Sequence, residues 1–196
     1  MNILMLVGQH VGQIGILTAQ ACGHKVIAVV PYNEDCEGAA HSLGIPVFES
    51  IKHLEFVGSP SAAHIVPIKA GGSPLEIHAL VSVHGREIIP ADILGRFKPE
   101  LRWNVHPYLD THPGTDPVGK ALASDDWNPL RVHAHILEPE VDSGRVLDYV
   151  SRDAGLTAAG ADVLDRQMVY SLLYPLYTAL LIRMFTRLDN AATDHL

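Results

Sequence analysis

The chain has 196 residues, 47% of them hydrophobic and 18% charged, which excludes an intrinsically disordered protein because such a chain can bury enough apolar surface to fold. Fourteen Lys and Arg residues against 22 Asp and Glu residues give a formal net charge of −8. Since no segment is rich in Lys and Arg, we expect no binding to nucleic acid.

The predicted elements alternate between continuous apolar runs and helix-length segments. In chain order they are a strand at Ile3–Val7, a helix at Ile14–Cys22, a strand at Lys25–Val30, a helix at Glu34–Leu43, strands at Ile45–Phe48, His64–Ile68 and His78–His84, a helix at Pro90–Phe97, a strand at Arg102–His106, a helix from Pro117 to Leu122, strands at Arg131–Leu137 and Arg145–Val150, and a long helix from Thr157 to Arg187 that is kinked near Pro175. Strands without polar alternation are typical of a parallel sheet that is buried on both faces.

This order predicts an α/β protein with a single domain, a largely parallel Rossmann-like sheet and helices on both faces. We expect residues 1–150 to form the α/β catalytic domain. Residues 151–196 are expected to add a long C-terminal helix, which packs on the same domain or in a homodimer interface.

The cysteine and hydropathy patterns give an expected location. Cys22 and Cys36 lack the spacing of a metal site or of a dense disulfide framework, which is typical of a reducing compartment, although one disulfide stays open. The run Met1–Gly8 has no basic region before it and is interpreted as a strand. The longest later apolar stretch, from Leu172 to Ile182, is shorter than the roughly 18–20 residues of a membrane span. We therefore expect a cytoplasmic protein without membrane contact.

Two glycines, Gly8 and Gly12, follow the first strand, where a dinucleotide fold carries its phosphate loop. Their spacing does not match G-x-G-x-x-G, although Glu34 and Asp35 lie near the position of a ribose-binding carboxylate. We favour a plain strand-to-helix turn over NAD binding.

Asn104 and His106 lie two residues apart at the carboxyl end of a predicted strand, so both side chains project from one face of the sheet. Asp142 lies in a tight acidic turn further along the chain. An imidazole, an amide and a carboxylate together can stabilise an oxyanion and move protons, although each residue alone is more often a cap or a hydrogen-bonded loop residue. His133 and His135 share a strand face, so a metal-dependent hydrolase is an alternative to hydrogen-bonded core or surface histidines.

Four segments together resemble a known family: Arg102–Pro107, Pro113–Pro117 with the helix after it, Val132–Ile136, and Glu140–Leu147. They are similar in order and spacing to the 10-formyltetrahydrofolate-dependent formyltransferases, which include the glycinamide ribonucleotide, methionyl-tRNA and amino-sugar formyltransferases. The resemblance implies the formyltransferase fold and 10-formyltetrahydrofolate as the formyl donor.

The resemblance also implies roles for individual residues. The catalytic triplet would be Asn104, His106 and Asp142, without a metal ion. The donor pocket would comprise two segments and the strand histidine, namely Gly85, Arg86, Glu87, Ile88, Ile89, His135, Glu138, Glu140 and Val141. The acceptor would contact Gln9, His10 and Tyr108.

Three departures from the family pattern concern the acceptor. Tyr108–His112 replaces the S-L-L-P stretch and is shorter by one residue, and His133 stands where the family usually has threonine. Gly8-Gln9-His10 replaces the Gly-Ser-Asn loop of the glycinamide ribonucleotide enzymes. The acidic balance and the lack of room for an RNA-binding domain favour a small amine over a tRNA acceptor, and the altered loop makes an amino sugar the first choice. The alternatives are a formyltetrahydrofolate or metal-dependent hydrolase and a folate-binding module without turnover.

Overall fold

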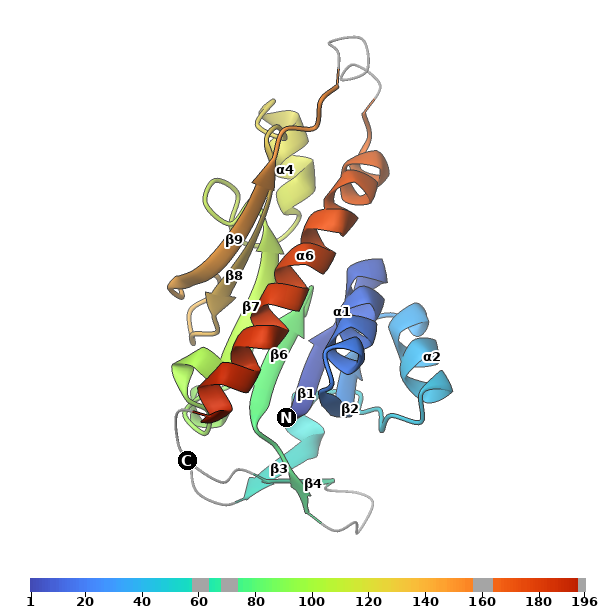
Figure 1. Cartoon of the computed structure of the whole chain (residues 1–196), viewed down its shortest axis with the longest axis vertical. Helices are drawn as coiled ribbons and strands as arrows, with labels where there is room; N and C mark the ends of the chain where they lie inside the picture. The colour runs from blue at the N-terminus through green and yellow to red at the C-terminus, as the bar shows by residue number, and fades with distance from the viewer. Residues whose placement is uncertain (58–63, 68–73, 157–163, 194–196) are drawn as a thin grey trace.

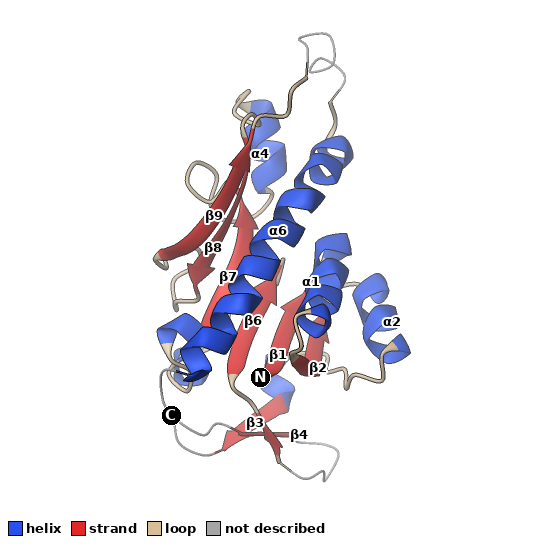
Figure 2. Cartoon of the chain, in the orientation of Figure 1, coloured by secondary structure: helices blue, strands red, loops and turns tan. Residues whose placement is uncertain are grey.

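The computed structural model describes residues 1–57, 64–67, 74–156 and 164–193. A six-stranded sheet forms the centre of the molecule, with the order β2-β1-β6-β7-β8-β9 (Figures 1 and 2). Its strands are β1 (Asn2–Val7), β2 (Lys25–Pro31), β6 (Ala79–Val83), β7 (Arg102–Pro107), β8 (Leu130–Ile136) and β9 (Val146–Arg152). The first four strands in this order are parallel to each other, whereas β8 and β9 pair antiparallel. The predicted α/β class with a largely parallel sheet is confirmed.

Helices cover both faces of the sheet. The helices are α1 (Gln9–Ala21), α2 (Glu34–Ser42), α3 (Ala91–Leu94), α4 (Pro117–Ala123) and α6 (Arg166–Thr193), with short 3-10 turns η1 (Ile51–His53) and η2 (Pro99–Leu101). On one face α1, α2 and α6 bury side chains such as Ile16, Cys36 and Phe185 with Met5 and Trp103 of the sheet (Figure 1). The second face has a separate apolar core under η1 and α3.

That second core packs Leu4, Leu6 and Leu80 of the sheet against Ile51 and Ile93. It covers β1, β2 and β6 but contains no side chain of β7 or β8. Polar side chains can therefore occupy this face of β7 and β8, and the functional site lies there. A small antiparallel sheet of β3 (Leu54–Val57), β4 (His64–Pro67) and β5 (Leu75–Glu76) lies at one end of the molecule (Figure 2).

Several predicted boundaries are wrong for local reasons. The predicted strand at Ile45–Phe48 is only an isolated bridge between Val29 and Val47, because Pro46 has no N–H to donate to a ladder. The helix α1 begins at Gln9, so Gly8 is its N-cap and no glycine loop follows the strand. Gly12 lies inside α1, where a Cβ atom would come within 2.9 Å of the Cys36 Sγ atom, so this glycine serves close packing.

Other elements differ mainly in length. The predicted helix Pro90–Phe97 is limited to α3, with Pro90 as its N-cap. Of the predicted strand His64–Ile68 the structure describes β4, and residue 68 lies outside the described residues. The long helix begins at Arg166 rather than near Thr157, and residues 157–163 lie outside the described residues. Cys22 and Cys36 form no disulfide bond.

The helix α6 belongs to the core on the first face. Its segment Arg166–Leu188 is long and apolar enough to cross a membrane by length and composition alone, contrary to the expectation from the sequence. In the fold, however, it packs against α1, β8 and β9, and Leu173, Tyr177 and Leu180 are buried there. Two arginines of the same helix, Arg183 and Arg187, bind the buried Asp148 of β9, so α6 is also held to the sheet by ion pairs.

Candidate active site

A row of three polar side chains crosses the uncovered face of the sheet. Ser82 of β6 is in register with Asn104 of β7, which is in register with His135 of β8. All three are buried, with exposed fractions of 4%, 8% and 2%. The sequence analysis missed Ser82, although it is the one polar residue in the otherwise apolar strand β6.

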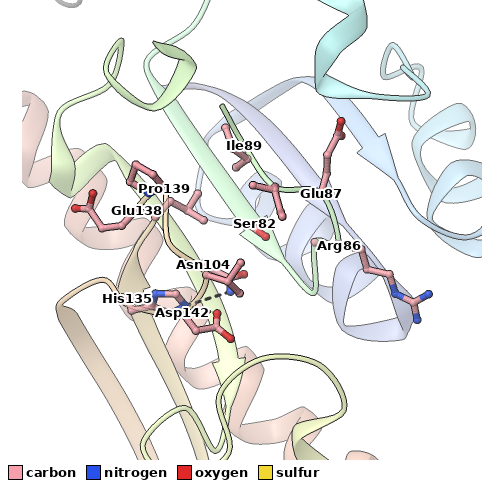
Figure 3. Close-up of a pocket in the computed structure, with 13 residues that line it drawn as sticks. Ser82, Arg86, Glu87, Ile89, Asn104, His135, Glu138, Pro139 and Asp142 are labelled. Atoms are coloured by element: carbon pink, nitrogen blue, oxygen red, sulfur yellow. Dashed lines mark hydrogen bonds and ion pairs between the residues drawn. The ribbon is translucent and has the colours of Figure 1, made fainter. Parts of the chain in front are cut away.

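This row forms the floor of a pocket with about 530 Å³ of empty space, part of it open to solvent (Figure 3). One wall is the segment after β6, Gly85–Ile89, and the other is the segment from Leu137 to Asp142, of which Glu140 alone does not line the pocket. The structure therefore brings together, around one pocket, most of the residues that the resemblance assigns to the donor.

The hydrogen-bond partners of His135 assign its tautomer. Burial lowers the pKa of His135 below its usual value, and the Asp142 carboxylate opposes this effect. The neutral ring donates from Nδ1 to the carbonyl oxygen of Ile136 at 3.0 Å, so its Nε2 atom accepts from Nδ2 of Asn104 at 3.2 Å. The orientation of the Asn104 amide is thereby fixed, because only its nitrogen can donate to His135.

Asp142 lines the pocket and contacts His106, which does not line it. Its Oδ2 atom lies 3.3 Å from Nε2 of His106 and accepts the backbone N–H of Gly114 at 2.6 Å. Nε2 of His106 also lies 3.0 Å from the carbonyl oxygen of Gly114, so this nitrogen carries the hydrogen. The other ring nitrogen, Nδ1, is buried without a hydrogen-bond partner among the described residues. A neutral His106 therefore has a vacant lone pair and can take up a proton.

The loop that carries Asp142 needs special backbone geometry. Asp142 has a φ of 57°, in the left-handed region that Asp tolerates better than most residues. At Gly144 a Cβ atom would lie 1.8 Å from the carbonyl oxygen of Ile136, so only glycine fits there. This close contact with the end of β8 turns the loop back over the sheet and places Asp142 above Asn104 and His135.

The opposite wall is held by Glu87. Its carboxylate accepts from the Ser50 hydroxyl and from the backbone N–H of Ile51, and its own N–H donates to the hydroxyl of Tyr32. The Glu87 side chain and backbone N–H are thus occupied, and this residue offers a ligand its backbone carbonyl oxygen. Ile88 and Val141 are 67% and 59% exposed on the two walls, so an apolar surface lies on each side of the opening.

Five expected site residues do not line this pocket. His106 contacts Asp142, which lines the pocket, but does not line the pocket itself. Glu140 does not line it either. Tyr108 is fully buried and its hydroxyl donates to the carbonyl oxygen of Trp127 at 2.6 Å, so its hydroxyl is not available to an acceptor, contrary to the expectation. Gln9 also lies outside the pocket, and its backbone N–H is bound to Oδ1 of Asn33.

His10 lies outside the pocket as well, next to an aromatic group on α6. It is an exposed residue whose ring stacks on Tyr174 at a centroid distance of 6.4 Å, and its Nδ1 atom lies 4.0 Å from Asp35. His84 contacts Tyr170 and Tyr177 nearby, with Nε2 at 2.5 Å from the Tyr177 hydroxyl. Burial lowers the pKa of His84 to about 3, so this histidine stays neutral.

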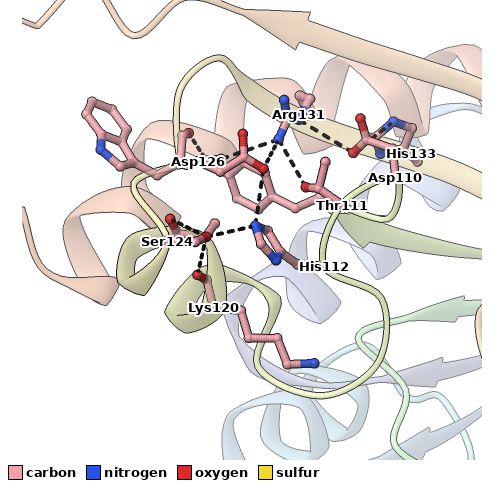
Figure 4. A network of polar contacts seen from close by, with 11 residues as sticks. Asp110, Thr111, His112, Lys120, Ser124, Asp126, Arg131 and His133 are labelled. Atoms are coloured by element: carbon pink, nitrogen blue, oxygen red, sulfur yellow. Dashed lines mark hydrogen bonds and ion pairs between the residues drawn. The ribbon is translucent and has the colours of Figure 1, made fainter.

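A second polar cluster, centred on Arg131, occupies the far end of β8 (Figure 4). Arg131 binds Asp126 at 2.9 Å and lies 3.5 Å from Asp110, while Asp126 also lies 3.2 Å from Nε2 of His112. This cluster holds the loop 108–112 that departs from the family pattern. His133, the other departure, lies 3.9 Å from Asp110 and stacks on Tyr149. Within the described ranges, no group of three or more His, Cys, Asp or Glu side chains could hold a metal ion.

The chain was compared with known proteins. No protein-family model and no curated protein sequence matches it. Among solved structures it is similar to phosphoribosylglycinamide formyltransferase from Bacillus halodurans, with 12% identity, a TM-score of 0.69 and coverage of 97% of each chain. The corresponding enzyme from Streptococcus pneumoniae TIGR4 has 17% identity and a TM-score of 0.64, with coverage of 96% of this chain and 98% of that chain.

A hydrolase has a similar structure. The formyltetrahydrofolate deformylase from Pseudomonas putida KT2440 matches with 16% identity and a TM-score of 0.60, and the match covers 94% of this chain but 63% of that chain. At such identities the likeness establishes the fold. The chain therefore has the formyltransferase fold, as its sequence resemblance implies.

Proposed function

We propose that this protein transfers the formyl group of 10-formyltetrahydrofolate to the amine of a small molecule. The observation that carries the proposal is the arrangement of Asn104, His135 and Asp142 on one pocket of the formyltransferase fold, with His106 bound to Asp142. An amide donor, a carboxylate and a proton-accepting imidazole are the groups that formyl transfer needs.

The reaction begins with attack of the neutral amine nitrogen on the formyl carbon, which gives a tetrahedral oxyanion. Asn104 has a second Nδ2 hydrogen besides the one bound to His135, and this hydrogen would stabilise the oxyanion. Asp142 accepts the proton that the attacking nitrogen loses, while the Nε2–H group of His106, 3.3 Å from Oδ2, holds the Asp142 side chain in position. The bond between the formyl carbon and N10 then breaks, and the proton returns to N10. The products are an N-formyl compound and tetrahydrofolate.

The folate ring would lie between the two walls of the pocket. Ile88 and Val141 would cover its faces, since both are more exposed than apolar residues usually are. The backbone of Gly85–Ile89 would bind the polar edge of the ring. Arg86 and Glu138 also line the pocket. The Glu138 carboxylate lies 3.4 Å from Arg102, which holds this wall in place.

For the acceptor we propose an amino sugar rather than a phosphorylated purine precursor. The N-terminus of α1 is poorly suited to a phosphate group, because Asn33 occupies the N–H of Gln9 and the carboxylate of Asp35 lies near His10. Aromatic rings such as those of His10 and Tyr174 suit the apolar face of a sugar ring. Both observations support an acceptor without a phosphate at this position.

We further propose a cytoplasmic location, because Cys22 and Cys36 form no disulfide bond, which is typical of a reducing compartment. Residues 151–196 are proposed to belong to the same folding unit as the preceding domain, because α6 buries its apolar side chains in the core on the first face. Formation of a homodimer, which the sequence gives as one alternative, stays a prediction.

A screen of amines tests the function. The protein is incubated with 10-formyltetrahydrofolate and a panel of amino sugars, nucleotide-linked amino sugars and glycinamide derivatives, while tetrahydrofolate, N-formyl product and formate are quantified. Stoichiometric N-formyl product and tetrahydrofolate are expected with one class of amine. Release of formate at the same rate with and without amines would instead indicate hydrolysis. Binding of 10-formyltetrahydrofolate without either product would indicate a binding module.

Hydrolysis of 10-formyltetrahydrofolate is the second candidate, because formyltetrahydrofolate deformylases share this fold. A water molecule would then replace the amine as the nucleophile, and Asp142 would accept its proton. A metal-dependent variant of this reaction is tested by dialysis against a chelator, since only a metal-dependent activity is lost and then restored by divalent ions.

A further inference from the structure

The turn after β6 carries the chain from one face of the sheet to the other. Val83 belongs to the core on the first face, whereas Ile89 belongs to the core on the second face. The turn between them begins at His84, which has a φ of 58°, in the left-handed region that most residues avoid. The pocket wall Gly85–Ile89 follows directly, so the conformation of His84 determines where this wall begins.

The backbone at the start of the wall is closely packed. The N–H of Gly8 donates to the carbonyl oxygen of Val83 at 3.0 Å, and a Cβ atom at Gly8 would lie 2.7 Å from the carbonyl oxygen of His84. At Gly85 a Cβ atom would lie 2.4 Å from the Oγ atom of Ser82. Because so little space separates these groups, a displacement of His84 must also displace the first residues of the wall.

The His84 side chain connects this turn to the core on the first face. Its Nε2 atom lies 2.5 Å from the hydroxyl of Tyr177, and its ring makes edge-to-face contacts with Tyr170 and Tyr177. Tyr177 is fully buried in α6 and belongs to the core on the first face. The residue that begins the pocket wall on one face is therefore bonded to a core residue on the opposite face.

The hydrogen bond between Tyr177 and His84 has one direction. Burial raises the pKa of Tyr177 well above its usual value, so the phenol keeps its hydrogen. Burial lowers the pKa of His84 to about 3, and the nearby charges of His106 and Arg86 act in the same direction, so the ring stays neutral. A fully buried hydroxyl needs an acceptor, and the Nε2 lone pair of His84 lies at hydrogen-bond distance. The Tyr177 hydroxyl therefore donates to His84.

We infer that the hydrogen bond from Tyr177 to His84 holds the Gly85–Ile89 wall in the position that binds folate, which makes both residues positioning residues of the donor pocket. The inference deepens the proposed formyl transfer and rests on it for the identity of the ligand. Glu87 fixes the middle of the wall at η1, and His84 fixes its beginning at α6. A wall held at two points is ordered before the ligand arrives, so less binding free energy is lost in ordering it.

Calorimetry of 10-formyltetrahydrofolate binding to Tyr177→Phe tests the inference. The change removes one hydroxyl and retains the packing of the ring. The wall should then occupy its binding position for a smaller fraction of the time, and the apparent Kd rises as that fraction falls. We expect a Kd about tenfold above that of the wild-type protein, the effect of about one buried hydrogen bond. At saturating donor, kcat with an amine found in the screen should change less than about twofold. An unchanged Kd would overturn the inference.

Two further variants separate positioning from a general loss of stability. Leu188→Ala removes buried apolar contacts near the other end of α6, so it should lower the free energy of unfolding but leave the Kd within about twofold. An equal rise in Kd would mean that loosening of α6 is sufficient, contrary to the inference. In a protein that carries His84→Asn, Tyr177→Phe should change the Kd less than about twofold, because the acceptor is already absent. A tenfold effect in both backgrounds would also contradict it.

The position of the wall can also be measured without a ligand. If the wild-type protein does not bind 10-formyltetrahydrofolate, the proposed function is refuted, and hydrogen exchange then tests the role of Tyr177. The backbone N–H of Glu87 donates to the Tyr32 hydroxyl at 3.0 Å, so it reports on opening of the wall. It should exchange at least about threefold faster in Tyr177→Phe than in the wild-type protein. Equal exchange rates would show that Tyr177 does not hold the wall.

Discussion

Two clusters of histidine and aspartate lie on the same face of the same two strands, yet they differ in how their charges are compensated. In the pocket, Asp142 contacts His106 and His135, and both partners are titratable imidazoles. In the cluster of Figure 4, Asp126 and Asp110 contact Arg131, whose guanidinium keeps its charge at every physiological pH. A carboxylate held by a permanent cation cannot easily accept a proton, whereas one beside neutral imidazoles accepts a proton more readily. The difference separates a structural cluster from a reactive one.

The register of β7 and β8 places the two clusters next to each other on these strands. His106 is paired with His133 and Asn104 with His135, so each cluster draws on neighbouring positions of β7 and β8. Both clusters contain buried atoms without a hydrogen-bond partner among the described residues, but of the residues that carry them only Asn104 lines the pocket. The following predictions exploit this contrast, from the largest expected effect to the smallest.

The largest effect is expected for Asp142→Asn. Asn retains the left-handed backbone and the acceptor for the Gly114 N–H, but it removes the charge that takes the proton of the amine. The rate of formyl transfer should fall by about a hundredfold or more, the range for lost general acid–base catalysis, while folate binding persists. Steady-state rates and calorimetry with folate measure the two quantities. The matched variant Asp110→Asn in the Arg131 cluster should retain most of the activity, and near-native activity of Asp142→Asn between pH 6 and 9 would contradict the mechanism.

A second effect follows from the loop that carries Asp142. In Gly144→Ala the new methyl group would overlap the carbonyl oxygen of Ile136, so the loop must move away from β8. We expect a loss of activity of at least about tenfold, because misplacement of a catalytic group by about 1 Å is already costly. Gly38→Ala, where no atom lies within 4 Å of the new Cβ inside α2, should leave the activity unchanged. Equal activities of the two variants would show that the position of this loop does not matter.

Removal of the permanent cation should affect stability rather than activity. Arg131→Met leaves Asp126 and Asp110 without their cation and removes the hydrogen bond to Thr111. Because both carboxylates are partly exposed, we expect a loss of about 1–2 kcal/mol in the free energy of unfolding. Urea denaturation measures it. The exposed pair of Arg145 with Glu100 provides the control, since Arg145→Met should cost less than about 0.5 kcal/mol. A large loss of kcat with unchanged stability in Arg131→Met would reverse the assignment of the two clusters.

The smallest effect concerns His84, a histidine that contacts no carboxylate among the described residues. Burial lowers its pKa to about 3, so the unfolded chain binds a proton near pH 6.5 that the folded chain does not bind until about pH 3. Stability contributed by the neutral ring is therefore present above pH 6.5 and is lost as the pH falls, by at most about 1.4 kcal/mol per pH unit. His84→Asn tolerates the positive φ of this position and should flatten the pH dependence of unfolding between pH 6.5 and 5. His41→Asn on the exposed side of α2 should not, and identical curves for both variants would contradict the buried neutral state.

Local patterns were sufficient for much of the fold and part of the site. Continuous apolar runs identified β1 and β2, because a strand buried on both faces has few polar positions. The alternation of a strand determined that Asn104 and His106 share a face, and Asp116 with Pro117 marked the start of α4. The resemblance of the segments around Asn104 and Asp142 indicated the formyltransferase fold. These inferences depend on residues close in the sequence, where steric and hydrogen-bonding preferences act directly.

The tertiary structure alone decided which residues each polar side chain contacts. No local signal showed that Ser82 would lie beside Asn104, because that neighbour comes from the order and register of parallel strands that are far apart in the sequence. No local signal showed the environment of Tyr108 either. It was expected to bind the acceptor, but it is buried against Trp127 and Arg131. The sequence determined which chemical groups are available and on which face of a strand they project. Packing of distant segments determined which carboxylate meets a permanent cation and which meets only imidazoles, because hydrogen bonding and charge depend on distance in space.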